Sequence, residues 1–257
     1  MSVLENKIII STRPLSEDDS IKRNLMDKGA IVLDFPMIQI CPMELNKDIE
    51  ELLQQIHSFQ WIVFTSKNGV DNFFKLLDQT SVHSDILARV KIAVVGKKTL
   101  EEVVKNNCNP YLLSTGGTSA DLLNELIQKV EPTERILLVL GELADDTLEQ
   151  GLVKVASPTR LNVYKTLHPG IHSKGIIERI RKNEYHMILF TSPSGFEQFK
   201  KLMPDKIIQN DFKSACIGRT TEKAMLNSHC RPLFVSRRSE GETFVNEIEL
   251  FFNNYKI

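Results

Sequence analysis

The fold is decided by a segment that reads Trp61-Ile-Val-Phe-Thr-Ser-Lys-Asn-Gly69 and returns as Met187-Ile-Leu-Phe-Thr-Ser-Pro-Ser-Gly195. Each copy begins with four apolar residues that do not alternate with polar ones, which favours a strand buried on both faces, as in a parallel sheet. A Thr-Ser pair follows, and then apolar residues recur at helical spacing. We therefore expect each Thr-Ser pair at the carboxyl end of a strand and the amino end of a helix.

The expected position of the two Thr-Ser pairs suggests a ligand site. Hydroxyl side chains cap helices, and the free N–H groups of a helix amino end hold anions. In open parallel sheets, ligands bind at the edge where the strands end. Capping needs no ligand and remains the alternative interpretation of each single pair, but two equivalent pairs favour a shared ligand cleft.

The duplication extends beyond these two segments. Thr191 follows Thr65 by 126 positions, and Gly218 follows Gly96 by 122. Strand-like and helix-like segments alternate between these residues, which indicates two similar α/β domains with parallel sheets. The expected strands cover residues 7–11, 31–34, 61–64, 90–96, 109–113, 135–140, 153–157, 162–166, 187–190, 215–218 and 232–235.

Two extended segments marked by prolines look like crossings between the domains. They would form a two-stranded linker, with one discontinuous and one continuous domain. The limits of this arrangement are 1–34 plus 170–257 for the first domain, 43–157 for the second, and 35–42 and 158–169 for the linker. Two consecutive domains that meet near residue 130 are the alternative, and spacing alone leaves both open.

Composition and charge exclude several classes of protein. The net charge of −1 argues against nucleic-acid or membrane binding through overall charge, so local groups would have to hold an anion. The four cysteines show no C-x-x-C spacing, which is typical of reduced thiols in the cytosol. Glu5 and Lys7 interrupt any apolar core of a signal peptide, and no apolar run is long enough for a membrane span. We therefore expect a cytoplasmic protein.

Motifs for cofactors and metals are missing. The sequence has neither G-x-G-x-x-G after a strand nor G-x-x-x-x-G-K-[ST], so no nucleotide cofactor is indicated. His168 and His172 are four apart, but Pro169 and Gly170 between them exclude a helical metal-binding pair. We expect no cofactor and no metal.

Two polar loops are weaker candidates for anion binding. Residues 114–119 include Gly116 and Gly117, which let backbone N–H groups approach an anion. In the equivalent loop of the second repeat, Arg237 and Arg238 suit carboxylate or phosphate binding. A polar turn and a solvated charged loop are the respective alternatives.

Several short motifs, spread over nearly the whole chain, form a recognisable set. They are Thr12-Arg13-Pro14 after the opening strand, Thr65-Ser66-x-Asn68-Gly69, Val163-Tyr164-x-Thr166, Thr191-Ser192-Pro193-Ser194-Gly195 and Ile217-Gly218-x-Thr220-Thr221. Together, on a duplicated α/β chain without cofactor motifs, they resemble the uroporphyrinogen-III synthase family in content and order.

The resemblance implies a fold and a reaction. The fold is two α/β domains with flavodoxin-like parallel sheets, joined by a two-stranded linker. The substrate is hydroxymethylbilane, a linear tetrapyrrole with many carboxylates, bound between the domains. The enzyme, a lyase of heme and tetrapyrrole biosynthesis, closes the macrocycle with loss of water and inverts the D ring, without metal or organic cofactor. We expect a monomer, with a transient contact to the preceding pathway enzyme.

The resemblance also implies roles for individual residues. Tyr164 is the expected catalytic residue, because a tyrosine with an ordinary pKa of about 10 is protonated at neutral pH and can donate to a departing hydroxyl. The alternative for Tyr164 is an ordinary amphipathic strand tyrosine. The expected substrate contacts are Arg13, Thr65, Ser66, Thr99, Thr191, Ser192, Ser194, Gly195, Thr220 and Thr221.

The chain departs from the family pattern in one turn, and other functions compete with the synthase. Family members carry basic residues near positions 140–141 and 145–146, where this chain is apolar and acidic; the candidates to replace them are Lys67, Lys97, Lys98, Arg13 and Arg219. A non-catalytic two-domain protein that binds an anionic small molecule is the main competing function. A sugar or phosphoryl transferase is disfavoured because nucleotide motifs are missing.

Overall fold

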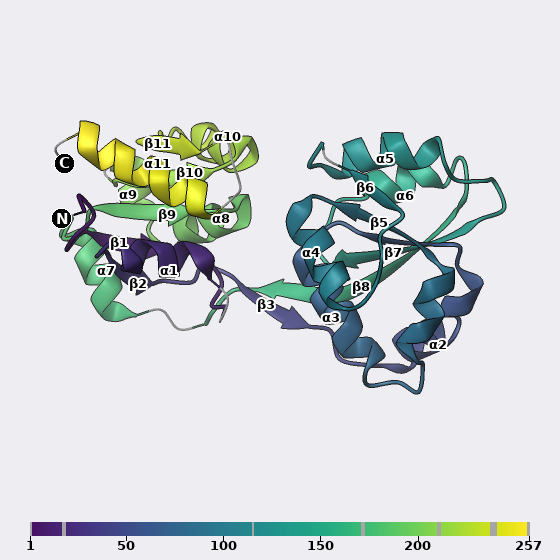
Figure 1. The fold of residues 1–257 in the computed structure, drawn as a ribbon. Helices are drawn as coiled ribbons and strands as arrows, with labels where there is room; N and C mark the ends of the chain where they lie inside the picture. Colours follow the sequence, from purple (N-terminus) through teal and green to yellow (C-terminus); the bar gives the residue numbers. More distant parts are fainter. Residues whose placement is uncertain are drawn as a thin grey trace. The chain divides into compact units, whose positions relative to one another are not determined.

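The computed structural model describes residues 2–16, 19–114, 116–170, 173–209, 212–236 and 241–255. It divides into two compact units, which are coloured along the chain in Figure 1. Unit 1 combines Met1–Gln39 with Leu167–Ile257, and unit 2 is the continuous segment Ile40–Thr166. Each unit contains one sheet covered by helices on both faces. In the described part of the chain, no helix has the length and apolar character needed to cross a membrane.

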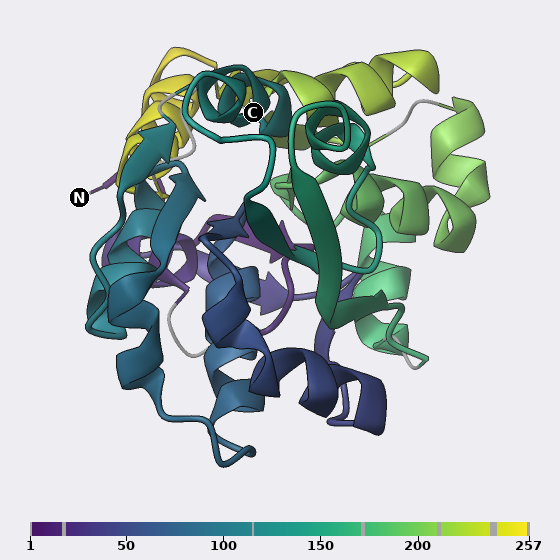
Figure 2. The same ribbon diagram turned by 90° about the vertical axis from the view of Figure 1, so that its right-hand side faces the viewer.

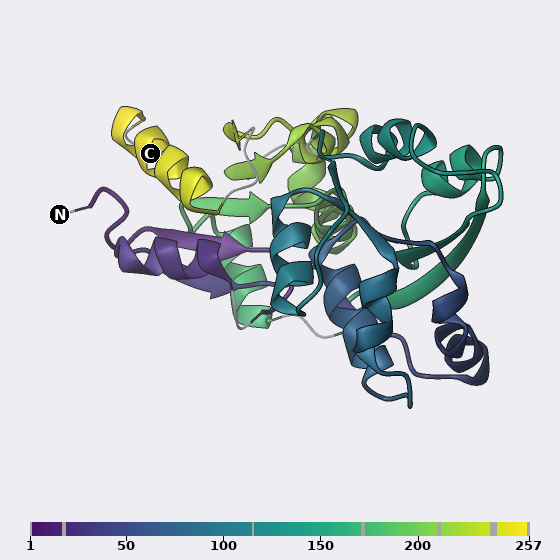
Figure 3. The same ribbon diagram turned by 45° about the vertical axis from the view of Figure 1, so that its right-hand side comes forward.

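Unit 1 has a five-stranded sheet whose order is β11-β10-β9-β1-β2, and all its neighbouring strands are parallel. Figure 3 shows β1 and β9 side by side, although Ile9 pairs with Met187 far along the chain. The strands are β1 (Ile8–Ser11), β2 (Ile31–Asp34), β9 (Met187–Phe190), β10 (Ser214–Ile217) and β11 (Phe234–Ser236). The helices are α1 (Ser20–Asp27), α7 (Lys174–Arg181), α8 (Pro193–Leu202), α9 (Pro204–Gln209), α10 (Arg219–Asn227) and α11 (Gly241–Asn254).

The repeated apolar run explains why this sheet is buried on both faces. In β9, Met187 and Leu189 join the core beneath α1 and α11, whereas Ile188 and Phe190 join the core beneath α7, α8 and α10. All four residues of β9 are buried. A strand without polar alternation is therefore what two covering layers require, as the sequence predicted.

Unit 2 has a six-stranded sheet whose order is β3-β8-β7-β4-β5-β6. Figure 2 shows this sheet between α2 and α3 on one side and α5 and α6 on the other. The strands are β3 (Gln39–Pro42), β4 (Trp61–Phe64), β5 (Lys91–Val95), β6 (Leu112–Ser114), β7 (Arg135–Gly141) and β8 (Ser157–Leu167). The helices are α2 (Lys47–Gln54), α3 (Lys67–Leu77), α4 (Lys97–Lys105), α5 (Ser119–Ile127) and α6 (Thr147–Leu152), with short 3₁₀ turns at Ile56–Ser58 and Ser84–Arg89.

The two sheets show how the duplication is used. Read from β2 and from β8, the sheets run β2-β1-β9-β10-β11 and β8-β7-β4-β5-β6, so β7 and β8 take the places of β1 and β2. Likewise β4, β5 and β6 take the places of β9, β10 and β11. Each sheet thus combines the first two strands of one repeat with the last three of the other. This exchange accounts for the discontinuity of unit 1.

One predicted strand is wrong. Residues 153–156 form a turn after α6, and β8 is instead a single strand of 11 residues that includes Pro158. Proline lacks an N–H group and is tolerated in a strand where one edge is unpaired. The hydrogen bond from Met43 N to Val163 O (2.9 Å) places β3 beside the later part of β8, whereas Pro158 pairs with Ile136 of β7.

Candidate functional site

Both Thr-Ser pairs end a strand and cap the next helix, as predicted. Gly69 N donates to Ser66 Oγ at 3.0 Å, and Gly195 N donates to Ser192 Oγ at 3.1 Å. The two serines even share their backbone angles, φ −152° and ψ 151°. The duplicated motif therefore builds the same corner twice, once in each unit.

The neighbouring strand ends are also duplicated. Gly96 after β5 and Gly218 after β10 start α4 and α10 with φ of 74° and 79°, in the left-handed region that favours glycine. Neither provides a side-chain cap, so first-turn N–H groups of α4 and α10 are free of a capping hydroxyl. Helix amino ends without a side-chain cap at a strand-end rim suit an anionic ligand group.

In unit 2, a tyrosine from β8 meets the first of these corners. The Tyr164 hydroxyl lies 3.3 Å from Ser66 Oγ, and either atom could be the donor. Its ring packs so closely on Gly141 that a β-carbon there would lie 2.4 Å from the tyrosine Cζ. The ring of the half-buried Tyr164 thus packs against the backbone of Gly141, and its hydroxyl lies at the end of β4.

The hydrogen-bonding roles at this contact favour a free phenolic proton. Ser66 Oγ already accepts the N–H of Gly69, so its own hydrogen is available for the Tyr164 oxygen. If Ser66 donates, the tyrosine hydroxyl keeps its hydrogen for another acceptor. Tyr164 can then act as a proton donor, and the phenolate that forms can accept the hydrogen bond from Ser66.

The opening strand ends close to the second corner, in unit 1. Thr12 Oγ1 donates to Leu189 O at 2.6 Å, and a β-carbon on Gly195 would lie 3.8 Å from this threonine oxygen. Arg13 donates through Nε to Asp19 Oδ2 at 3.0 Å. Because Asp19 also caps α1, the guanidinium of Arg13 is fixed against a helix end.

Two lysines lie at the helix starts of this edge of unit 2, Lys67 in α3 and Lys97 in α4. Lys67 approaches the buried carboxylate of Glu102 at 3.4 Å, and Lys105, at the last turn of α4, approaches the same carboxylate at 3.4 Å. Lys97 is exposed at the start of α4. The rim therefore carries positive charge whose position is set partly by Glu102, in line with an anionic ligand.

The polar loops and histidines that were weaker candidates add little to the site. Thr118 and Asp121 form a capping box at the start of α5, so the polar-turn interpretation of this loop is sufficient. Arg237, Arg238 and His172 lie outside the described residues. Within the part of the chain that the structure describes, no cluster of three or more His, Cys, Asp or Glu side chains could hold a metal ion.

Comparison with known proteins gives the family. The model of the family described as uroporphyrinogen-III synthase HemD matches residues 19–246 of this chain. The chain belongs to the uroporphyrinogen-III synthase HemD family. The porphyrin biosynthesis protein HemD of Ruminiclostridium josui is 26% identical over 248 residues, which cover 93% of this chain and 47% of that protein. The chain thus spans about half the length of this relative.

Other relatives match over most of their length. A putative uroporphyrinogen-III synthase of Methanocaldococcus jannaschii is 28% identical over 88% of this chain and 91% of its own. A mutant uroporphyrinogen III synthase of Thermus thermophilus has a TM-score of 0.70 at 17% identity, covering 97% of this chain and 100% of its own. The Helicobacter pylori enzyme has a TM-score of 0.58 at 14% identity, covering 95% and 98%. These solved structures show that the two-domain α/β fold is shared.

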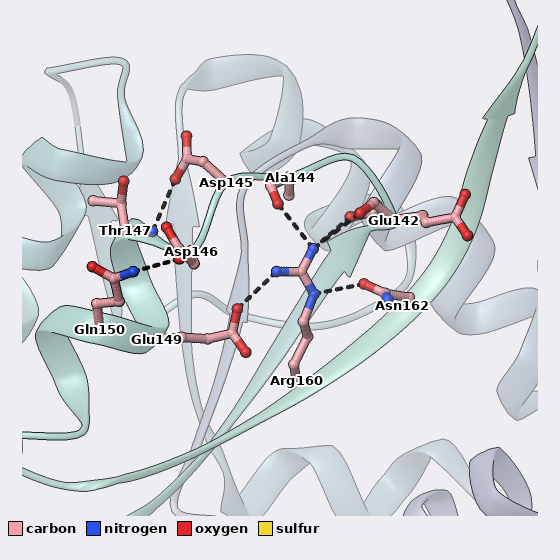
Figure 4. A network of polar contacts seen from close by, with 10 residues as sticks. Glu142, Ala144, Asp145, Asp146, Thr147, Glu149, Gln150, Arg160 and Asn162 are labelled. Atoms are coloured by element: carbon pink, nitrogen blue, oxygen red, sulfur yellow. Dashed lines mark hydrogen bonds and ion pairs between the residues drawn. The ribbon is translucent and has the colours of Figure 1, made fainter.

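The loop after β7, where the family pattern predicts basic residues, is organised by an arginine from β8. Figure 4 shows the Arg160 guanidinium among the carbonyl groups of this loop. It donates to Gly141 O and Ala144 O, both at 3.0 Å, and pairs with Glu149 Oε2 at 2.7 Å. Arg160 could not be singled out from the sequence, because nothing around it distinguishes it from a solvated strand residue.

One acidic residue of the same loop, Asp145, is stabilised as an anion. Hydrogen bonds from the Thr147 side chain and backbone, followed by the charge of Arg160, lower the pKa of Asp145 despite some burial. Thr147 N donates to Asp145 Oδ1 at 3.0 Å. Asp145 therefore stabilises the loop. As an anion it cannot bind a carboxylate of the ligand in the way that a basic residue would.

The predicted contacts fall at the strand ends of both units. In unit 2, Thr65 and Ser66 follow β4, Thr99 is buried in the first turn of α4, and Tyr164 is in β8. In unit 1, Arg13 follows β1, while Thr191, Ser192, Ser194 and Gly195 follow β9. After β10, Thr220 is exposed and Thr221 is buried. The structure brings Tyr164 and Ser66 into contact, and likewise Ser192 and Ser194, whose hydroxyls are 3.2 Å apart.

Proposed function

We propose that this protein converts hydroxymethylbilane to uroporphyrinogen III, with loss of water and inversion of the D ring, and is therefore a lyase. Membership of the uroporphyrinogen-III synthase family supports the proposal. The observation that carries it is the contact of Tyr164 with Ser66 at the edge where β4 ends. A proton donor at the strand-end edge, beside a helix amino end without a side-chain cap, fits a polycarboxylate that must lose a hydroxyl.

Substrate binding needs no large net charge. The charge of hydroxymethylbilane is spread over many carboxylates, which helix amino ends, backbone N–H groups and hydroxyls can bind one by one. We propose that these contacts come from Arg13, Thr65, Ser66, Thr99, Thr191, Ser192, Ser194, Gly195, Thr220 and Thr221. Since Asp19 holds Nε of Arg13, this arginine would contact substrate only through its terminal nitrogens.

Tyr164 acts as the general acid in this proposal. Its hydroxyl protonates the departing hydroxyl of the substrate, while Ser66 donates to the phenolate that forms. Water leaves, and an electron-poor azafulvenium cation remains. The phenolate regains its proton when the cyclised product recovers its aromatic pyrrole, so the enzyme ends unchanged.

Steering of the ring closure is mainly a matter of position. The azafulvenium is reactive by itself, and the substituted carbon of the D ring must attack it to give a spiro intermediate. The older bond from that carbon to the methylene of ring C then breaks, which leaves this methylene as a second azafulvenium. The free α-carbon of the inverted D ring attacks it, and the proton that this carbon loses restores Tyr164. Binding the carboxylates holds the linear tetrapyrrole in one conformation, in which the substituted carbon attacks in preference to its free neighbour. No metal or organic cofactor is needed for these steps.

The decisive experiment supplies freshly generated hydroxymethylbilane and determines which isomer forms. We expect type III to exceed the spontaneous type I product, and Tyr164→Phe to lower turnover by about tenfold while the fold is kept. Binding without a change of isomer would instead support the non-catalytic binding protein. An unchanged rate in Tyr164→Phe would reject the acid role but keep the synthase.

Two further properties belong to the same proposal. We propose that the protein acts as a monomer and receives its unstable substrate through a transient contact with the preceding enzyme of the pathway. Sedimentation of the free protein tests the first, and a competition assay with an unrelated trap for hydroxymethylbilane tests the second. The cytoplasmic location stays a prediction.

A further inference from the structure

The direction in which Tyr164 points contradicts the simple alternation of a strand. Side chains of β8 face opposite sides of the sheet in turn. Leu161 and Val163 lie in the core beneath α2, α3 and α4, whereas Arg160 contacts Glu149 of α6 on the other face. By this alternation residue 164 should face α6, with Arg160. Instead Tyr164 packs against the core of Leu161 and Val163 and reaches Ser66.

An irregularity in the pairing of β7 with β8 explains the change of side. Leu140 is paired with Asn162, but the next residue, Gly141, is paired with Tyr164. Val163 is therefore an extra residue opposite the step from Leu140 to Gly141, as in a β-bulge. Such bulges re-aim the side chains that follow them, and here the bulge turns Tyr164 toward the end of β4.

The bulge is held in place by the loop that follows β7. Glu142 N donates to Tyr164 O at 2.9 Å, which continues the pairing past the bulge. Gly141 lies against the tyrosine ring, where no larger residue would fit without a shift. The position of the loop thus fixes both the backbone and the ring of Tyr164.

Arg160 fixes this loop through one terminal nitrogen of its guanidinium. Its Nη2 donates to Gly141 O and Ala144 O, and more weakly to Glu142 O at 3.4 Å. Its remaining donors go to Glu149 Oε2 at 2.7 Å and Asn162 Oδ1 at 2.8 Å (Figure 4). Such use of all three guanidinium nitrogens at once is beyond a lysine, which has a compact point charge.

We propose that Arg160 is a positioning residue that aims Tyr164 at Ser66 by locking the β7–β8 bulge. The proposal rests on the proposed role of Tyr164 in the synthase reaction. Arg160 touches no reacting atom; it acts through the loop carbonyls and Gly141. Its removal should therefore lower turnover more than it changes substrate affinity, and only as long as Tyr164 is present.

The first test is a double-mutant cycle with hydroxymethylbilane as substrate. We expect Arg160→Met to lower kcat by about tenfold with KM changed less than about threefold, because a small misplacement of a catalytic group has a large effect on rate. Arg160→Lys should rescue little of this. In a Tyr164→Phe background, Arg160→Met should have no further effect on kcat. An equal loss in both backgrounds would overturn the proposal.

The second test follows Tyr164 itself and needs no activity. The chain has four tyrosines, so the NMR signal of a ¹³C-labelled Tyr164 ring can be assigned by its loss in Tyr164→Phe. We expect this signal to shift or broaden in Arg160→Met and in the milder Glu149→Gln, while the other tyrosine signals stay. An unmoved Tyr164 signal in both variants would refute the positioning role, even if the synthase reaction itself were absent.

A matched arginine serves as control for both tests. Arg135 lies at the opposite end of β7 in the same unit, where it donates to Ser58 Oγ at 2.6 Å and covers the ring of Phe59. Arg135→Met should cost stability without moving the Tyr164 signal or lowering kcat. If this control moves the signal as much as Arg160→Met does, the effect is a general loosening of the sheet and the proposal fails.

Discussion

Ser66 has two roles that a substitution can separate. It caps α3 by accepting from Gly69 N, and it contacts the Tyr164 hydroxyl. Ser66→Ala should therefore cost about 1 kcal/mol of stability from the lost cap. It should also lower turnover about tenfold, because the phenolate of Tyr164 loses its charge-assisted hydrogen bond. Thermal unfolding and steady-state kinetics measure the two effects.

A second cap in the same unit provides the control for Ser66→Ala. Asn46 caps α2 by accepting from Ile49 N at 3.0 Å, the same length as the bond to Ser66. Asn46→Ala should lower the melting temperature about as much as Ser66→Ala does, by roughly 2–4 °C, and leave turnover unchanged. Equal turnover in both variants would mean that Ser66 is only a cap.

His186 makes the stability of unit 1 sensitive to acid. Its Nδ1 accepts from Ile8 N at 2.9 Å, and burial, followed by the charges of Lys7 and Lys213, lowers its pKa below the ordinary 6.5. The unfolded chain thus takes up a proton more readily than the folded one. The stabilisation is present above about pH 6.5 and is lost as the pH falls through the lowered pKa of the folded state.

For His186 we predict an effect on how steeply the melting temperature depends on pH. Between pH 7.5 and 5.5 the melting temperature should fall more steeply for the wild type than for His186→Gln, which cannot gain a proton there. The exposed His83 gives the control, since His83→Gln should keep the slope of the wild type. Parallel curves for the wild type and His186→Gln would show that Nδ1 accepts no structurally important bond.

At the scale of elements, the junction of β7 and β8 is the sharpest point to perturb. A β-carbon on Gly141 would lie 2.4 Å from Cζ of Tyr164, whereas one on Gly151 would lie 2.3 Å from a methyl group of Leu123. Overpacking of this kind costs about 1–3 kcal/mol, less where a flexible end can move. Gly141→Ala should therefore lower both the melting temperature and, about tenfold, the turnover.

Gly151→Ala is the partner of this experiment, since its contact joins α6 to α5 and not to Tyr164. It should lower the melting temperature while turnover stays within about twofold. Comparable losses of turnover in Gly141→Ala and Gly151→Ala would show that general destabilisation, and not the tyrosine ring, decides the rate.

The same junction marks the limit of what the sequence could predict. The strands that end in Thr-Ser and their capping role follow from local pattern, because burial on both faces and a hydroxyl at a helix start leave clear signatures in consecutive residues. The bulge at Val163 has no such signature, since it depends on how β7 pairs with β8. The contact of Tyr164 with Ser66 joins residues 98 positions apart and could be expected only through the family resemblance.

Local pattern also failed where two elements meet. The apolar residues of 153–156 suggested a strand, but they end α6 and turn into β8, where Val155 and Ala156 pack against the core beneath α5 and α6. A short apolar run is compatible with a strand or with a buried turn. Only the neighbours in space decide between them, and Pro158 misleadingly marked a break inside a continuous strand.

For the whole molecule, the exchange of strands between repeats decides which pieces can fold. The cores beneath the helices of unit 2 consist only of residues between 49 and 163, and those of unit 1 consist only of residues outside that range. A half chain cut at the repeat boundary keeps β4 and β5 but loses β7, the other neighbour of β4. The repeat is thus a unit of sequence and not of folding.

Because the repeats exchange strands, we expect opposite behaviour from two polypeptides of similar length. Residues 40–166 contain four complete strands, all but one residue of β3 and of β8, and both cores of unit 2, so this fragment should show a cooperative thermal transition by circular dichroism. Residues 1–130 contain one full repeat but split both sheets, and should lack a cooperative transition, because a buried strand without its neighbour exposes apolar surface and unpaired backbone. A folded 1–130 fragment beside an unfolded 40–166 fragment would show that the repeat, and not the exchanged unit, carries the stability.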